Sequence, residues 1–262
     1  MERWRGKWAL VTGASAGLGA EFARQLAAAG AHLVLTARRK ERLEQLAADL
    51  RGRNGVQVEV FAADLAQNGA AEALFAFTEG RRLEIELLIN NAGFGAYGEF
   101  HRIPLARQRE MLRVNISAVV QLTHLYLPQM IARRRGDILI VASTAAFQAV
   151  PYISTYAATK AFDLIFAEGI AEEVRPFGVR VCALCPGSTH TEFRAVSGQP
   201  EKTFRMAESA EKVVRRGLRG LARGKTCIIS GVHNRLMMES ERLAPRRWVT
   251  AVSAAMFRPP ES

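Results

Sequence analysis

The first apolar run of this sequence ends in Thr12-Gly13-Ala14-Ser15-Ala16-Gly17-Leu18-Gly19, which opens a segment with helical spacing. Glycines in this GxxxGxG pattern permit a tight turn and a close approach of the backbone to a pyrophosphate. The N-terminus of the following helix would point at that negative charge. An ordinary strand-to-helix turn is the alternative, but the position at the first such junction favours dinucleotide binding. We therefore predict that a cofactor contacts Gly13, Ser15, Ala16, Gly17, Leu18 and Gly19.

Short apolar runs alternate with longer helical patterns along the rest of the chain. Strands are predicted over 8–11, 32–36, 57–62, 87–90, 137–142, 180–184 and 227–230, and helices over 18–29, 40–51, 70–79, 105–134, 155–175 and 210–223. This order predicts an α/β fold: a single-domain, Rossmann-type, doubly wound parallel sheet of about seven strands with helices on both faces. Ligands of such sheets bind beyond the carboxyl ends of the strands.

Length and composition fit one domain over residues 1–262, with 232–262 as a C-terminal helical extension of it. Hydrophobic residues make up 49% of the chain, which is ample for a continuous core. The first strand is too short for the core of a signal peptide, and no run approaches the roughly 18 apolar residues of a spanning helix. We therefore expect a soluble, cytoplasmic protein.

The formal net charge of +11 is carried mostly by scattered arginines. Without interleaved aromatic residues, this pattern favours solvated surface charge over a nucleic-acid partner. Cys182 and Cys185 share a predicted strand at an odd offset, so their side chains would point to opposite faces and could not hold one metal ion. We interpret them, and Cys227, as structural thiols, and we predict no metal site.

The end of the second strand, Ala37-Arg38-Arg39, indicates which dinucleotide is bound. A site selective for NAD would place a carboxylate here for the ribose hydroxyls, whereas arginine can bind the 2′-phosphate of NADP. We predict NADP(H), with Arg38 as the main phosphate ligand and Arg39 or Ser15 assisting. The alternative is that both arginines merely begin the next helix. Asp64 and Leu65, after the third strand, are expected beside the adenine.

Tyr156 and Lys160 stand four residues apart in a predicted helix, so both side chains lie on one face. A lysine charge stabilises a phenolate and lowers the pKa of a tyrosine toward the working range of an acid–base catalyst. Ser143 ends the fifth strand at the edge where ligands bind. A chance surface pair would leave the position of Ser143 unexplained, so a catalytic interpretation is favoured.

The sequence resembles the short-chain dehydrogenase/reductase family, in its branch of about 250 residues, over nearly its whole length. The resemblance rests on the glycine turn, Asn90-Asn91-Ala92-Gly93, Asn115, Ser143, Tyr156-x-x-x-Lys160 and Pro186-Gly187 in this order. Stretches such as Leu35-Thr36-Ala37-Arg38-Arg39 are most similar to the bacterial DltE-like group. The physiological substrates of that group are mostly unassigned.

The resemblance implies a role for each catalytic residue. Tyr156 would exchange a proton with the substrate oxygen, Ser143 would hydrogen-bond that oxygen, and Lys160 would bind the nicotinamide ribose and lower the pKa of Tyr156. Asn115 would hold a water in a proton relay behind Lys160. The cofactor would also be lined by Asn91, Ala92, Gly93, Pro186, Gly187, Thr189 and Thr191. A homodimer or homotetramer is expected from the family.

An apolar substrate pocket is indicated by aromatic residues beside the motifs. Phe94, Phe147, Tyr152 and Phe193 are the candidates, and segment 188–209, with Phe204 and Met206, should cover the site. Such a wall favours an apolar ketone or acyl chain over a small sugar. Each aromatic residue, taken alone, fits the core better than a ligand contact.

The C-terminal segment places Trp248, Val249, Val252, Ala255 and Met256 on one face of a helix, with arginines nearby. We expect this face to pack on the substrate segment or on a neighbouring subunit. The alternative is a basic amphipathic helix on a membrane surface.

The leading hypothesis from the sequence is an enzyme that transfers hydride between NADPH and the carbonyl of a small-molecule substrate. One alternative is a non-catalytic dinucleotide sensor or scaffold on the same fold, which would be free to lose its acid–base residues. The other is a membrane-associated reductase of lipid metabolism.

Overall fold

A computed structural model describes residues 2–199, 207–241 and 243–259 of the chain. Its main sheet has seven parallel strands in the order β3-β2-β1-β4-β5-β6-β9. The order reverses between β1 and β4, which pair with each other. The strands are β1 (Trp8–Thr12), β2 (His32–Ala37), β3 (Val58–Ala62), β4 (Ile85–Asn90), β5 (Gly136–Val141), β6 (Val179–Cys185) and β9 (Cys227–Ile229).

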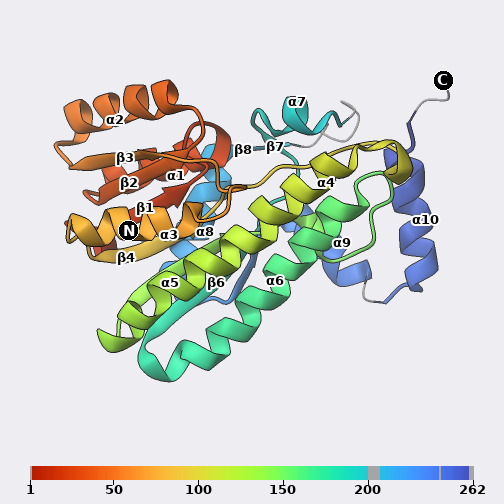
Figure 1. Cartoon of the computed structure of the whole chain (residues 1–262). Helices are drawn as coiled ribbons and strands as arrows, with labels where there is room; N and C mark the ends of the chain where they lie inside the picture. Colours follow the sequence, from red (N-terminus) through yellow and green to blue (C-terminus); the bar gives the residue numbers. More distant parts are fainter. Residues whose placement is uncertain (1, 200–206, 242, 260–262) are drawn as a thin grey trace.

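Helices cover both faces of this sheet, as Figure 1 shows. One apolar core joins the sheet to α1 (Gly17–Ala28), α2 (Lys40–Asn54) and α8 (Ala210–Ala222). The other joins it to α3 (Ala70–Gly80), α5 (Ala118–Ala132) and α6 (Ser154–Val174). The predicted α/β fold, a Rossmann-like domain with a doubly wound parallel sheet, is confirmed.

The predicted strand pattern also explains the burial of the cysteines. Cys182 and Cys185 are both completely buried in β6, but Cys182 belongs to the first core and Cys185 to the second. Their side chains therefore lie on opposite faces of the sheet, as the odd offset predicts. Cys227 in β9 is half-buried on the same side as Cys185.

The helical segment predicted over 105–134 is present over 105–132, but a π-helical turn divides it. This turn, η3 (Arg113–Ser117), separates α4 (Leu105–Leu112) from α5. Its centre is Asn115, whose buried side chain hydrogen-bonds the backbone of Phe94 on the neighbouring loop. Turns of this type interrupt a helix locally and occur frequently at functional sites, and apolar periodicity does not reveal them.

Shorter elements complete the described chain at both edges of the sheet. The segment after β6 forms β7 (Thr189–His190), α7 (Phe193–Ser197) and β8 (Glu208–Ser209), while Phe204 and Met206 lie outside the described residues. The remaining turns are 3-10 helices: η1 (Glu2–Trp4), η2 (Phe100–Arg102), η4 (Thr144–Ala146) and η5 (Arg175–Phe177).

The C-terminal segment folds into α9 (Val232–Glu241) and α10 (Arg246–Phe257). Trp248, Val252 and Met256 on α10 are between half and two-thirds exposed, so the described part of the substrate segment does not cover these three side chains. The opposite side of α10 contacts the domain instead, through a hydrogen bond from Ser253 to Gln148. A subunit contact and a membrane contact both stay predictions. Among the described residues, no helix is both long enough and apolar enough to cross a membrane.

The amino-terminal edge of the sheet is held by a buried carboxylate. Asp137 at the start of β5 has no exposed surface and accepts hydrogen bonds from Arg3, Trp4 and Arg180 at 2.7–3.0 Å. These contacts tie the start of the chain to β5 and β6. A buried carboxylate with this many charge-assisted partners is strongly coupled to folding.

Asp137→Ala should therefore lower the free energy of unfolding by about 2 kcal/mol or more, because it leaves two guanidinium groups without their acceptor. Urea unfolding of both proteins would measure the difference. The control is Asp49→Ala, which removes an exposed ion pair with Arg53 on α2 and should change little. Equal effects of the two substitutions would contradict the importance of the Asp137 cluster.

Candidate active site

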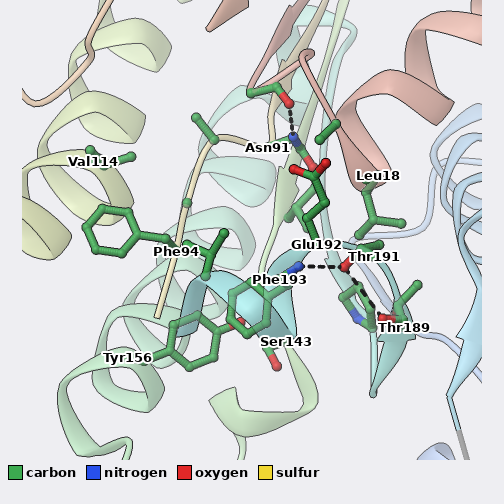
Figure 2. A pocket seen from close by; sticks show the side chains of 18 of the residues that line it. Leu18, Asn91, Phe94, Val114, Ser143, Tyr156, Thr189, Thr191, Glu192 and Phe193 are labelled. Carbon is green, nitrogen blue, oxygen red and sulfur yellow. Dashed lines mark hydrogen bonds between the residues drawn. The ribbon is translucent and has the colours of Figure 1, made fainter. Parts of the chain in front are cut away.

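A cleft of about 360 Å³ opens at the carboxyl ends of the strands. Its walls come from the turn between β1 and α1, the ends of β2 to β6, the start of α6 and the segment after β6. Figure 2 shows Leu18 and Asn91 in one part of the cleft and Phe94, Tyr156 and Phe193 gathered in another. Most of the residues singled out from the sequence meet here, although they come from distant parts of the chain.

The glycine turn has the conformation that its sequence predicts. Gly13 and Gly17 have φ of +66° and +55°, a region that favours glycine. Gly19 does not line the cleft, because it packs behind the turn: a Cβ there would lie 2.2 Å from the Gly13 carbonyl oxygen. Its role is to let α1 approach the turn closely. No side chain caps the first turn of α1, whose N-terminus is thus available to an anion.

Thr12 and Asn91 join the ends of β1 and β4 where the strand order reverses. The Thr12 hydroxyl accepts hydrogen bonds from the backbone nitrogens of Asn91 and Ala92, both at 2.9 Å. The Asn91 amide donates to the Thr12 carbonyl at 2.8 Å. These bonds fix the glycine turn against the Asn91-Ala92-Gly93 loop, and both line the cleft.

The arginines predicted to bind a phosphate lie at one end of the cleft. Arg38 pairs with Glu110 at 2.9 Å, and Arg39 donates to the Ser15 hydroxyl at 3.1 Å and to Glu192 at 2.8 Å. The contact between Arg39 and Ser15 joins two of the predicted phosphate ligands. Asp64 and Leu65 line the same end, where the Asp64 carboxylate also accepts the backbone N–H of Ala66.

Ser143, Tyr156 and Lys160 converge on the cleft from η4 and α6. Ser143 follows β5 and caps η4 by accepting the Ala145 N–H at 3.1 Å. Tyr156 is 8% and Lys160 5% exposed, so both ionisable groups are almost entirely removed from water. The Lys160 ammonium donates to the Val141 carbonyl at 2.8 Å and to the Asp163 carboxylate at 2.9 Å.

Burial raises the pKa of the Tyr156 phenol above its usual value and outweighs the Lys160 charge and Ser143, which both lower it. Lys160 thus acts in the predicted direction, but the net shift of the Tyr156 pKa is upward. Burial lowers the pKa of Lys160, but Asp163 and Tyr156 raise it by more than burial lowers it. The net pKa of Lys160 is therefore raised, and the ammonium keeps its proton. In this environment both groups carry protons at neutral pH.

Asn115 lies behind the cleft and does not line it. Its amide donates to the Phe94 carbonyl and to the Thr159 hydroxyl, both at 3.0 Å, and its oxygen accepts the Phe94 N–H at 3.1 Å. The side chain therefore ties the loop after β4 to α6, one residue before Lys160. The predicted role of Asn115 in a water relay stays a prediction.

The segment after β6 supplies a second wall of the cleft. Pro186, Gly187, Thr189 and Thr191 line it as predicted. Gly187 is held from behind by α9, since a Cβ on Gly187 would lie 2.5 Å from the Asn234 amide. Part of the C-terminal extension thus positions the loop that the sequence assigns to the cofactor.

Apolar side chains surround the Tyr156 end of the cleft. The Tyr156 and Phe193 rings are tilted with centroids 5.2 Å apart, and Figure 2 shows them side by side. Phe94 also lines the cleft. The substrate assignment of Phe147 and Tyr152 is not supported, because neither is among the described residues that line it. Phe147 packs on the core, and Tyr152 turns the chain with φ of +67°.

Several lining residues have no recognisable signal in the sequence. Val114, Ile153 and Phe257 complete the apolar wall together with Val196, which belongs to the predicted covering segment 188–209, and Phe257 reaches the wall from the end of α10. Glu192 lines the cleft and binds Arg39 and Arg42. Its position beside Thr191 could have suggested this contact, whereas Phe257 is brought there only by the tertiary fold.

The fold and the cleft together define an α/β protein with a dinucleotide-type glycine turn and a buried tyrosine–lysine pair. Its relatives agree. A family model described as short chain dehydrogenase matches residues 7–202. The chain is 31% identical over 254 residues to a 7beta-hydroxysteroid dehydrogenase of Clostridium sardiniense, and the match covers 96% of each.

Two further proteins are similar to this chain, one over part of its length and one over nearly all of it. A very-long-chain 3-oxoacyl-CoA reductase of Phaeosphaeria nodorum is 37% identical over 183 residues, which are 68% of this chain and 53% of that protein. The chain thus spans about half the length of that relative. The solved structure of a short-chain dehydrogenase from Sphingobium yanoikuyae in complex with NADPH is 31% identical, with a TM-score of 0.84 and coverage of 94% and 95%.

This chain belongs to the short-chain dehydrogenase family of oxidoreductases. The family prediction and the prediction of an enzyme are confirmed. The finer resemblance to the DltE-like group stays a prediction.

The packing of Gly19 generates a first test of the cleft. Gly19→Ala would press a methyl group onto the Gly13 backbone, so the glycine turn must shift. We expect the affinity for NADPH to fall more than tenfold, with a loss of about 1–3 kcal/mol in unfolding free energy. Fluorescence titration and thermal unfolding would measure these effects.

The matched control is Gly169→Ala on α6, where an added Cβ meets no atom within 4 Å. It should bind NADPH normally and be unchanged or slightly more stable. Normal NADPH binding by Gly19→Ala would show that close packing behind the turn is not needed.

Proposed function

We propose that this protein is an NADPH-dependent carbonyl reductase for a bulky apolar ketone or 3-oxoacyl-type substrate. One observation carries the proposal: the buried Tyr156–Lys160 pair and the glycine turn line the same cleft, together with apolar side chains such as Phe94 and Phe193. The Sphingobium relative is named as a complex with NADPH, and two others are named as acting on hydroxysteroids and 3-oxoacyl-CoA. These names support a large apolar substrate.

The residues of the cleft fit a phosphorylated dinucleotide. Gly13 and Gly17 keep side chains away from the turn, and the N-terminus of α1 presents uncapped N–H groups to a pyrophosphate. Arg38, Arg39 and Ser15 would bind the 2′-phosphate through charge-assisted hydrogen bonds. Ala37 brings no carboxylate that would repel that phosphate. The bound nicotinamide supplies the hydride.

The chain itself supplies the proton and the shape of the site. Tyr156 donates its phenolic proton to the carbonyl oxygen as that oxygen gains negative charge, and the Ser143 hydroxyl donates a hydrogen bond to the same oxygen. Lys160 binds the ribose hydroxyls and stabilises the phenolate that remains. Phe94 and Phe193 exclude water and hold the apolar part of the substrate.

Tyr156→Phe should reduce turnover by at least about a hundredfold, because no other group at this position can donate the proton. NADPH binding should persist. The measurement is NADPH consumption with 3-oxoacyl thioesters, steroid-like ketones, aldehydes and small diketones. Turnover by the variant at the normal rate would refute the assigned role. If the unmodified protein bound NADPH but consumed none with any of these substrates, the sensor alternative would be favoured.

The cofactor preference has its own test in the arginines after β2. Arg38→Ala and Arg39→Ala should each weaken NADPH binding by about tenfold or more and leave NADH binding nearly unchanged, because only NADPH has the 2′-phosphate. Arg24→Ala, an exposed arginine on α1 that pairs with Glu21, is the control for lost charge. Equal losses for both dinucleotides in the variants would refute phosphate recognition.

A further inference from the structure

A carboxylate without an assigned role lies one helical turn after Lys160. Asp163 has no exposed surface, and its Oδ2 is 2.9 Å from the Lys160 ammonium. Its other oxygen, Oδ1, has no hydrogen-bond partner among the described residues. Burying a carboxylate with one unpartnered oxygen costs folding free energy, so its presence calls for an explanation. The roles proposed above use Tyr156 and Lys160 and give Asp163 none.

The geometry around the ammonium shows what Asp163 does to Lys160. An ammonium has three N–H donors. The Val141 carbonyl accepts one and Asp163 accepts a second, so one donor remains. The ammonium nitrogen lies against Gly93 on the cleft wall, 3.3 Å from where a Cβ of that glycine would stand. The two acceptors anchor Lys160 and leave its third donor for a ligand in the cleft.

Most of the described groups that face the Lys160–Asp163 pair and Tyr156 are neutral. Ser143 faces Tyr156 from the end of β5, Asn115 lies nearby on η3, and the Cys185 thiol faces Lys160 from β6. Hydrogen bonding with Cys227 and burial raise the pKa of Cys185 far above its usual value, so this thiol is uncharged. The negative charge of Glu168 on α6 also acts to raise the pKa of the Cys185 and Cys227 thiols.

Asp163 changes the proton affinity of both neighbours in the same direction. Its negative charge raises the pKa of Lys160 against the effect of burial, and it also raises the pKa of Tyr156. Burial raises the pKa of Asp163 itself, while Lys160 holds it down. A reductase needs both partners protonated, because Tyr156 gives a proton and the Lys160 charge stabilises the product phenolate.

We propose that Asp163 is a positioning residue for the reaction proposed above: it holds Lys160 charged and turned toward the cleft, and it keeps the Lys160–Tyr156 pair fully protonated for reduction. This inference rests on the proposed function of Tyr156. It requires no additional reactant, because the proton that reaches the carbonyl oxygen is still the phenolic proton of Tyr156.

Asp163→Asn is the direct test, because asparagine keeps the size and an acceptor for Lys160 but removes the charge. Loss of a negative charge lowers the pH at which the first proton leaves the coupled Lys160–Tyr156 pair, whichever group releases it. The alkaline decline of the reduction rate should therefore move to lower pH by about one unit or more. The measurement is the pH profile of kcat for NADPH-dependent reduction, with thermal unfolding to confirm folding.

Two further variants separate charge from packing. Glu172→Gln removes an exposed carboxylate from the same helix, and its profile should match that of the unmodified protein. Asp163→Glu keeps the charge in a longer side chain, so it should keep the alkaline limit even if it loses stability. A purely structural role would harm Asp163→Glu more than the isosteric Asp163→Asn.

The outcomes distinguish this proposal from the proposed function. An unchanged alkaline limit in folded, active Asp163→Asn would overturn the role of Asp163 and leave the function of Tyr156 standing. Turnover that does not depend on Tyr156 would overturn both.

Discussion

The hydrogen bonds between Thr12 and Asn91 are the interaction on which the site depends. They join β1 to β4 at the point where the strand order reverses, and neighbouring loops of a parallel sheet part in opposite directions there. The opening left by that divergence becomes the cleft. Because the same bonds hold the glycine turn against the Asn91-Ala92-Gly93 loop, the turn proposed to bind a pyrophosphate is joined directly to the loop that lies beside Lys160.

The two ends of the cleft handle charge in different ways. Arg38 and Arg39 are exposed and pair with Glu110 and Glu192, so their charges are solvated and can exchange one anion for another. Tyr156, Lys160 and Asp163 are buried, and each charge among them depends on its neighbours. Water-free surroundings strengthen those interactions, as the proposed proton transfer to a developing oxyanion would require. The apolar wall of Phe94 and Phe193 maintains those surroundings.

Much of the fold and half of the site follow from local sequence patterns. The alternation of Val-, Ile- and Leu-rich strands with amphipathic helices predicts a parallel sheet. Gly13 and Gly17 indicate a tight turn, because the backbone conformations of that turn favour glycine. The four-residue spacing of Tyr156 and Lys160 places both on one helix face. The π turn at Asn115 escapes such patterns, because it depends on hydrogen bonds to Phe94, which is distant in sequence. Phe147 and Tyr152 stand beside motifs but are not among the described residues that line the cleft, because adjacency to a motif does not determine which way a side chain points.

The sequence by itself determined the parallel sheet, the glycine turn and the shared helix face of Tyr156 and Lys160, the proposed acid–base pair, since each is encoded within a few consecutive residues. Only the tertiary structure decided how those residues are charged and what surrounds them. Burial raises the pKa of Tyr156 where spacing alone predicts a decrease, and Asp163 supplies the counter-charge for Lys160. Phe257 reaches the cleft from the far end of the chain. These properties depend on the exclusion of water and on contacts between distant segments, and a linear sequence does not state either of them.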